Sequence, residues 1–180
     1  CKSSQLVKII DIVSQPISSV FPTEKKYDLK EYSLDVFKCE DCELIQFGSV
    51  APLDDMYGST YGYRTSLSGL MINHMRTKYE KLINNNILKE NSLILDIGSN
   101  DGTFLNFFAN NEKNFRLHGI DPSAGKFSDY YNKRINLMVD YFSEKTVSTF
   151  FNDNKVIDNK FSLITSFAMF YDLEDPNAFC

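Results

Sequence analysis

An acid and two glycines follow a run of apolar residues near the middle of the chain. The run at 93–97 contains Asp96, and Gly98 and Gly102 then flank a short polar turn. A glycine lets the backbone fold closely against a ligand because it has no Cβ. The spacing D-x-G-x-x-x-G lacks the third glycine of the pattern that binds a pyrophosphate, and Asp101 adds a negative charge. The loop therefore favours a positively charged ligand, although an ordinary strand-to-helix turn remains the alternative.

A second acid lies about 20 residues past the glycine loop. Residues 115–120 lead into Asp121 and Pro122. A carboxylate at the end of a second parallel strand can accept hydrogen bonds from both hydroxyls of a ribose, and a proline fixes the turn. The alternative is that Asp121 only caps the following turn. The acidic loop suits the ammonium and sulfonium of S-adenosylmethionine. The glycine loop and the acid after the second strand together resemble the start of the S-adenosylmethionine pocket in Rossmann-like methyltransferases.

Cys39 and Cys42 form a C-x-x-C turn between two segments of strand-forming residues, 32–37 and 44–47. Both thiolates of such a turn can reach one metal, so we predict half of a tetrahedral zinc site. The redox alternative requires the motif to open a helix, which lowers a thiol pKa, and no helical pattern follows here. Cys1 supplies a third ligand unless it is an incidental terminal residue. We expect a fourth cysteine upstream of it.

Composition narrows the class of protein. The chain has 180 residues, 43% hydrophobic and 14% aromatic, which suffices for one ordinary domain or for a small and a medium one. A formal net charge of −5 argues against nucleic acid or an anionic membrane as the partner. No apolar run is long enough for a membrane span, and polar residues interrupt the start of the chain where a signal peptide would need an apolar core. We expect a cytoplasmic protein.

The elements that must position these residues follow from hydrophobic patterning. Continuous apolar runs predict buried parallel strands at 93–97, 115–120, 135–139 and 161–167, with helical patterns between them. The fold class is therefore α/β, with a Rossmann-like sheet at 91–180, a connector at 57–90 and a small zinc-binding β module at 1–56. Four strands are fewer than a doubly wound sheet usually has, and the chain does not begin with Met. We therefore expect a fragment of a longer enzyme.

The connector combines a loop rich in Tyr, Gly and hydroxyl side chains at 57–66 with a helix at 67–84. Tyrosines in such a loop can pack on an adenine or a sugar, or can simply pack on the protein. His74 falls beside the apolar stripe of the helix, where most histidines are structural. His118, inside a strand, is a weaker candidate for a site.

Taken together, these pieces resemble the sugar C-methyltransferases that act on nucleotide-linked ketosugars in deoxysugar biosynthesis. The resemblance covers essentially the whole chain. The residues that carry it are Cys1, Ser14-Gln15-Pro16, Cys39-x-x-Cys42, Tyr61-Gly62-Tyr63-Arg64-x-Ser66, the loop from Asp96 to Gly102, Asp121-Pro122-Ser123, Asp140-Tyr141-Phe142 and Ser166-Phe167-Ala168-Met169-Phe170.

The resemblance implies a structural zinc domain, a central S-adenosylmethionine domain and a further carboxyl-terminal domain. It assigns cofactor contacts by position: Gly98, Asn100 and Gly102 on the methionine side, Asp121 on the ribose, Asp140 and Tyr141 on the adenine, Ser166 and Phe167 beside the methyl group, and Tyr63 and Ser66 as a cover. It also implies a nucleotide-sugar substrate and carbanion chemistry, in which a base forms an enolate that attacks the sulfonium methyl.

The catalytic base is not evident in the chain. The resemblance places it downstream of Cys180, which leaves Tyr63 and His74 as the candidates within the sequence. Two other functions stay open at this point. One is a methyltransferase with another small-molecule acceptor, and the other is a zinc-ribbon binding module whose Rossmann-like part only senses a ligand. The acids around Cys39 and Cys42 disfavour nucleic acid as a partner of such a module, and the oligomeric state stays open.

Overall fold

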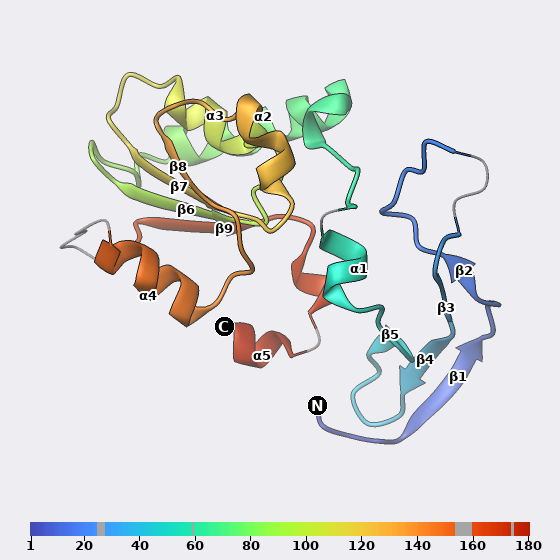
Figure 1. The fold of residues 1–180 in the computed structure, drawn as a ribbon. Coiled ribbons are helices and arrows are strands. Elements are labelled where there is room, and N and C mark those ends of the chain that lie inside the picture. Colours follow the sequence, from blue (N-terminus) through green and yellow to red (C-terminus); the bar gives the residue numbers. More distant parts are fainter. Residues whose placement is uncertain (25–27, 59, 154–159, 174) are drawn as a thin grey trace. The chain divides into compact units, whose positions relative to one another are not determined.

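The computed structural model describes the chain except for residues 25–27, 59, 154–159 and 174. It divides into two compact units, Cys1–Gly62 and Tyr63–Cys180 (Figure 1). The predicted connector is thus shared between them, since 57–62 belongs to the first unit and 63–90 to the second. Among the described residues, no helix combines the length and the apolar character that a membrane span requires.

The first unit is a small antiparallel β structure. Its elements are β1 (Leu6–Ile10), β2 (Gln15–Pro16), β3 (Glu31–Tyr32), β4 (Val36–Cys39), β5 (Ile45–Phe47) and α1 (Leu53–Tyr57). The main sheet has the order β1-β4-β5, and β2 pairs with β3. The turn between β4 and β5 carries the C-x-x-C motif, as the strand-forming flanks predicted.

Polar contacts rather than a buried core hold much of this unit together. Asp55 of α1 accepts hydrogen bonds from Lys30 Nζ at 2.7 Å and from the Tyr32 hydroxyl, and these two donors lower the pKa of its carboxyl. Lys8 of β1 pairs with Asp35 at 2.8 Å. Of the residues described in this unit, Cys39 alone is buried.

The second unit contains a four-stranded parallel sheet with helices on both faces, which confirms the predicted α/β class. Its strands are β6 (Leu93–Ile97), β7 (Arg116–Ile120), β8 (Ile135–Met138) and β9 (Leu163–Ser166), in the order β8-β7-β6-β9. Its helices are α2 (Gly69–Asn84), α3 (Thr103–Ala109), α4 (Glu144–Asp153) and α5 (Pro176–Phe179). The predicted strands lie within a few residues of these bounds.

Each face of the sheet has its own apolar cluster. Figure 1 shows α2 and α3 on one side of the sheet and α4 on the other. Ile94 and Leu117 belong to the cluster with α2 and α3, whereas Leu95 and Ile120 belong to the other cluster. Side chains that alternate between two covered faces explain why the strands are apolar throughout.

The start of the predicted helix differs from the expectation. Residues Thr65–Leu67 form a 3₁₀ turn, and α2 begins after Ser68, whose hydroxyl accepts a hydrogen bond from Met71 N at 3.3 Å. Leu70 is 81% exposed, while Met75 of the same helix is buried. The apolar stripe therefore begins at Met71, which packs on the core, and Leu67 and Leu70 are not part of it.

Candidate cofactor and metal sites

The glycine loop, Gly98–Gly102, folds over the carboxyl end of β7. Gly98 N and Ser99 N both donate to the carbonyl of Ile120, at 2.9 and 3.3 Å. Gly98 and Gly102 each have φ +72°, in the left-handed region that favours glycine. The loop therefore turns sharply at both ends, at the edge of the sheet where ligands of open α/β sheets bind.

The two glycines make room for different neighbours. A Cβ at Gly98 would lie 3.3 Å from the Met169 side chain, whereas a Cβ at Gly102 would lie 2.7 Å from the Tyr131 ring. The Tyr131 hydroxyl donates to the carbonyl of Asn100 at 2.8 Å and lies 2.8 Å from Ser99 Oγ. Gly102 is thus required by an internal tyrosine, not only by a ligand as the sequence suggested.

Tyr131 is a residue that sequence reasoning missed. It follows a short 3₁₀ segment, Ala124–Tyr130, and nothing in its local pattern marks it as a partner of a loop about 30 residues earlier. Burial raises the pKa of its hydroxyl, so that it stays protonated as a donor.

Asp96 is buried in β6, next to Gly119 of β7 and Thr165 of β9. Burial raises the pKa of its carboxyl to about 7, opposed by a hydrogen bond that Thr165 Oγ1 donates at 2.6 Å and reinforced by the charge of Asp121. No Lys, Arg or His in the described parts of the chain forms an ion pair with it. A bound cation would favour its ionised form.

Asp121 follows β7 and is also buried. Its Oδ2 accepts a hydrogen bond from Asn100 N at 2.8 Å, and its Oδ1 accepts from Ser123 N at 2.7 Å and from Ser123 Oγ at 2.6 Å. Its side chain therefore braces the turn at Asp121–Ser123 and also ties the glycine loop to the end of β7. A carboxylate offers about four acceptor positions, so one remains for a ribose hydroxyl, and a second becomes available if Ser123 Oγ turns away.

Asn100 has every polar group engaged within the second unit. Its side-chain oxygen accepts from Thr65 N at 2.9 Å and from Thr65 Oγ1 at 3.2 Å, and its Nδ2 donates to the carbonyl of Tyr63 at 3.1 Å. Its backbone N and O are bound by Asp121 and Tyr131. The side chain thus fastens the segment Tyr63–Ser66, below called the strap, to the glycine loop.

Asp101 completes this attachment. Its carboxylate accepts from Ser66 N at 2.9 Å, from Thr103 N at 3.2 Å and from Thr103 Oγ1 at 2.6 Å, and Arg64 Nε lies 3.8 Å away. Its negative charge is therefore directed at the strap and at the first turn of α3. Sequence reasoning noted the charge of Asp101 but not these partners.

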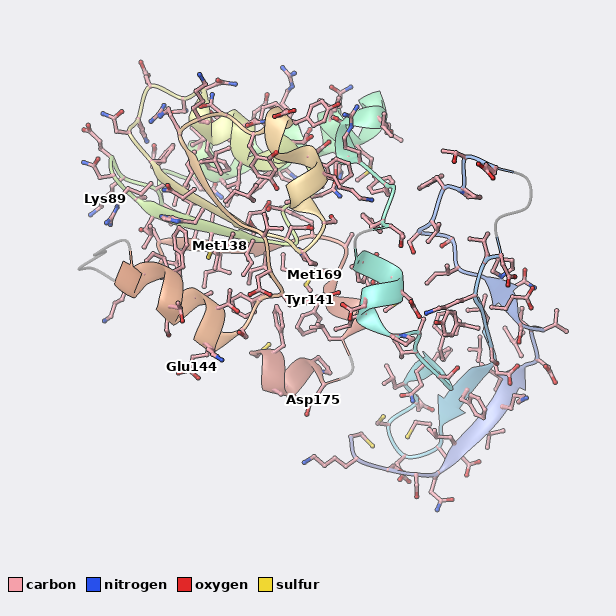
Figure 2. All side chains as sticks on the ribbon, in the orientation of Figure 1. Lys89, Met138, Tyr141, Glu144, Met169 and Asp175 are labelled. Carbon is pink, nitrogen blue, oxygen red and sulfur yellow. The ribbon has the colours of Figure 1, made fainter. Side chains whose placement is uncertain are left out.

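The predicted residues at the ends of β8 and β9 have varied surroundings. Ser166 Oγ is buried without a hydrogen-bond partner among the residues that the structure describes. Phe167 packs edge-on against Phe104, with ring centroids 4.8 Å apart. Asp140 is exposed and accepts a hydrogen bond from the backbone N of Tyr141 at 2.7 Å. Figure 2 shows Tyr141 on the loop that leads from β8 to α4.

The two histidines differ in burial. His74 is exposed on α2. His118 is buried in β7 against the rings of Phe150 and Phe151, at centroid distances of 5.4 and 5.3 Å. Burial lowers the pKa of His118 to about 4, helped by the charge of Arg116. His118 therefore stays neutral near pH 7 and packs as a core residue.

The three cysteines of the first unit gather in one place. The Sγ atoms of Cys1, Cys39 and Cys42 all lie within 4.8 Å of one another, and those of Cys1 and Cys39 are 3.9 Å apart. Zinc–sulfur bonds of about 2.3 Å in a tetrahedron place sulfurs about 3.8 Å apart, so the cluster fits a zinc ion. The backbone N–H groups of Cys42 and Asp41 lower the pKa of the Cys39 thiol, which favours the thiolate that a metal requires.

Each unit is similar to a known family. Residues 1–57 match the family described as "Putative zinc binding domain", and residues 71–179 match the family described as "Methyltransferase domain". Over 92 residues the chain is 32% identical to "C-methyltransferase NovU" of Streptomyces niveus. This alignment covers 51% of the chain and 21% of the relative, so the chain spans about a fifth of that protein's length.

Proposed function

This chain belongs to the methyltransferase family, and we propose that it forms the cofactor-binding part of an S-adenosylmethionine-dependent C-methyltransferase that acts on a nucleotide-linked ketosugar. The observation that carries the proposal is the pair of buried carboxylates, Asp96 and Asp121, on either side of a glycine loop at the carboxyl end of a parallel sheet. The family match gives the class of reaction.

The residues at this edge suit the cofactor. Asp96 is a buried acid without a cationic partner among the described residues, and the ammonium of the methionine moiety would supply one. Ser166 Oγ is a buried donor with no partner in the described chain, and it lies across from Ile97 at the start of the loop. The remaining acceptor position of Asp121 suits a ribose hydroxyl. Pro122, Asp140, Tyr141 and Phe167 are proposed to border the adenine and the methyl group.

The cofactor supplies an electrophilic methyl group, and the protein's part is to place it. In carbanion methylation a base would remove the proton beside the ketone, and the resulting enolate carbon would take the methyl group that bound S-adenosylmethionine supplies, with S-adenosylhomocysteine as the leaving group. The name of the relative supports carbon as the acceptor. His118 is unsuited as the base because it is enclosed by aromatic rings. We propose that the base lies after Cys180, with Tyr63 and His74 as the candidates within the chain.

Zinc is proposed to serve structure rather than catalysis. Cys1, Cys39 and Cys42 would provide three of its ligands, all from the first unit. Thiolate sites of this kind are closed structural sites when four-coordinate, and we propose that a further cysteine upstream completes this one.

Calorimetry and methyl transfer test the proposal. The protein should bind S-adenosylmethionine and S-adenosylhomocysteine, and it should bind NAD⁺ much more weakly. Radiolabelled methyl should move to carbon of a nucleotide-linked 4-ketosugar and not to the same nucleotide sugar reduced to the 4-alcohol, which has no acidified C–H. Preference for the nicotinamide cofactor would refute the assignment of the glycine loop. Transfer to both sugars would refute the enolate step.

A further inference from the structure

The strap, Tyr63–Ser66, lies about 35 positions before the loop that holds it. We propose that Asn100 and Asp101 are positioning residues, which fix the strap on the glycine loop in the arrangement that binds S-adenosylmethionine. This inference rests on the proposed function, and it gives the two loop residues a task that the D-x-G-x-x-x-G spacing alone does not indicate.

Burial makes the attachment strong. Asp101 is 1% exposed and Asn100 is 9% exposed. Buried polar side chains cost free energy unless their hydrogen bonds are satisfied, and here the backbone of Thr65 and Ser66 supplies the donors. Detaching the strap would leave the side chains of Asn100 and Asp101 without these hydrogen bonds. The strap is therefore held firmly against the loop.

The strap is also held through Arg64. The Arg64 guanidinium lies 3.9 Å from the centroid of the Tyr130 ring, and its Nε is 3.8 Å from Asp101. The cation–π contact and the carboxylate hold the same side chain from two elements. Two neighbouring tyrosines therefore stabilise the loop, Tyr130 through Arg64 of the strap and Tyr131 through Ser99 and its contact at Gly102.

The attachment fixes the path of the main chain. The bonds from Asn100 and Asp101 engage the carbonyl of Tyr63 and the N–H groups of Thr65 and Ser66. The side chains proposed to cover the cofactor, those of Tyr63 and Ser66, are thus carried on a backbone whose position the loop sets. Binding of the cofactor and order of the strap should then be coupled.

The test is Asp101→Asn in the protein. Asn forms the same side-chain bond to the backbone two residues on as Asp does, so the contact to Thr103 should survive. The amide cannot also accept from Ser66 N at full strength, and it carries no charge for Arg64. We expect the Ser66 amide to exchange its hydrogen about tenfold faster or more, and S-adenosylmethionine to bind about tenfold more weakly.

Asn111→Asp is the matched control. Asn111 also accepts from a backbone N, that of Lys113 at 2.9 Å, and donates through Nδ2, to the Tyr79 hydroxyl at 2.7 Å, but it does not touch the strap. It should lower the melting temperature without changing the affinity for the cofactor. If Asp101→Asn does not fold, Thr65→Val replaces it, since it removes only the 3.2 Å hydroxyl contact to Asn100, with an expected two- to fivefold loss of affinity (about 0.5–1 kcal/mol).

The binding and exchange measurements have three outcomes that would refute a claim. Wild-type protein that fails to bind S-adenosylmethionine refutes the proposed function and this inference with it. Wild-type binding together with unchanged affinity in Asp101→Asn, while Ser66 exchanges faster, shows that the strap is only structural and overturns this inference alone. Unchanged exchange at Ser66 shows that Asp101 does not hold the strap.

Discussion

The two units differ in what keeps them folded. Among the described residues of the first unit only Cys39 is buried, and every residue of β1 is exposed. In the second unit all five residues of β6 are buried, and Ile94, Leu95 and Leu105 are fully enclosed. Apolar burial stabilises by roughly 25 cal/mol per Å², so the second unit has a hydrophobic core and the first has almost none. We therefore expect the first unit to depend on its polar contacts and on a metal bound at its cysteine cluster.

The two sites differ in the same way. The candidate metal site uses side chains that converge on one point, and two of them are three residues apart. The glycine loop is held by partners from elsewhere in its own unit: the strap, Tyr131 and Asp121. Loss of zinc should therefore unfold the cysteine cluster. The glycine loop, in contrast, should keep its structure when S-adenosylmethionine is not bound.

The largest expected effect comes from Cys42→Ser. Apparent binding energies of structural zinc are on the order of 10 kcal/mol, and such energy is folding energy. We expect loss of bound zinc, rapid proteolysis within residues 1–62, and an intact second unit. Metal analysis and limited proteolysis would measure this.

Cys180→Ser is the control for that substitution. Cys180 is an exposed free cysteine of the other unit and lies outside the cluster. It should leave zinc content and protease resistance unchanged. Full zinc retention by Cys42→Ser would contradict the metal assignment.

The next effect in size is that of Asp121→Ala. The substitution removes the bond to Asn100 and the two bonds to Ser123, together with any bond to the ribose. We expect S-adenosylmethionine to bind about 1–3 kcal/mol more weakly, with a fall in melting temperature of the second unit. Calorimetry and thermal unfolding would measure the two effects. Asp129→Ala, at an exposed acid of the same segment, should change neither one.

What the sequence could predict depends on how local the cause is. Local sequence sets the strands at 93–97 and 115–120, the C-x-x-C turn, the acid Asp96 within the first of these strands and the acid Asp121 after the second, and these were predicted. The roles of Asn100, Asp101 and Tyr131 depend on contacts across about 30 to 35 positions, which no local pattern encodes. The adenine and methyl contacts at Asp140, Tyr141, Ser166 and Phe167 stay predictions.

A smaller effect is expected from Asp96→Asn, and it depends on pH. The pKa of Asp96 is raised from 3.8 to about 7 in the folded protein. The native state therefore binds more protons than the unfolded state. The contribution of Asp96 to the stability of the fold is complete below pH 4 and is lost as the pH rises through 7. The variant should melt higher than the wild type at pH 8 and similarly at pH 4. It should also bind S-adenosylmethionine more weakly, because the ammonium loses its carboxylate. A variant that is less stable at pH 8 would contradict the burial of an unpaired acid.

The smallest effect is expected from His118→Leu, which tests whether the two units respond to acid independently. The pKa of His118 is lowered from 6.5 to about 4, so the native state resists its protonation. The stability that it contributes is present above pH 6.5 and is lost as the pH falls through 4. Acid also competes with metal for the thiolates of the first unit, so acid unfolding of the wild type combines two causes.

Asp96 acts in the opposite direction over this range, so His118→Leu should be measured in the Asp96→Asn background. There it should retain a higher melting temperature of the second unit between pH 6 and pH 4, while zinc release from the first unit keeps the same pH midpoint. A shifted midpoint of zinc release would mean that the two units do not respond to acid independently.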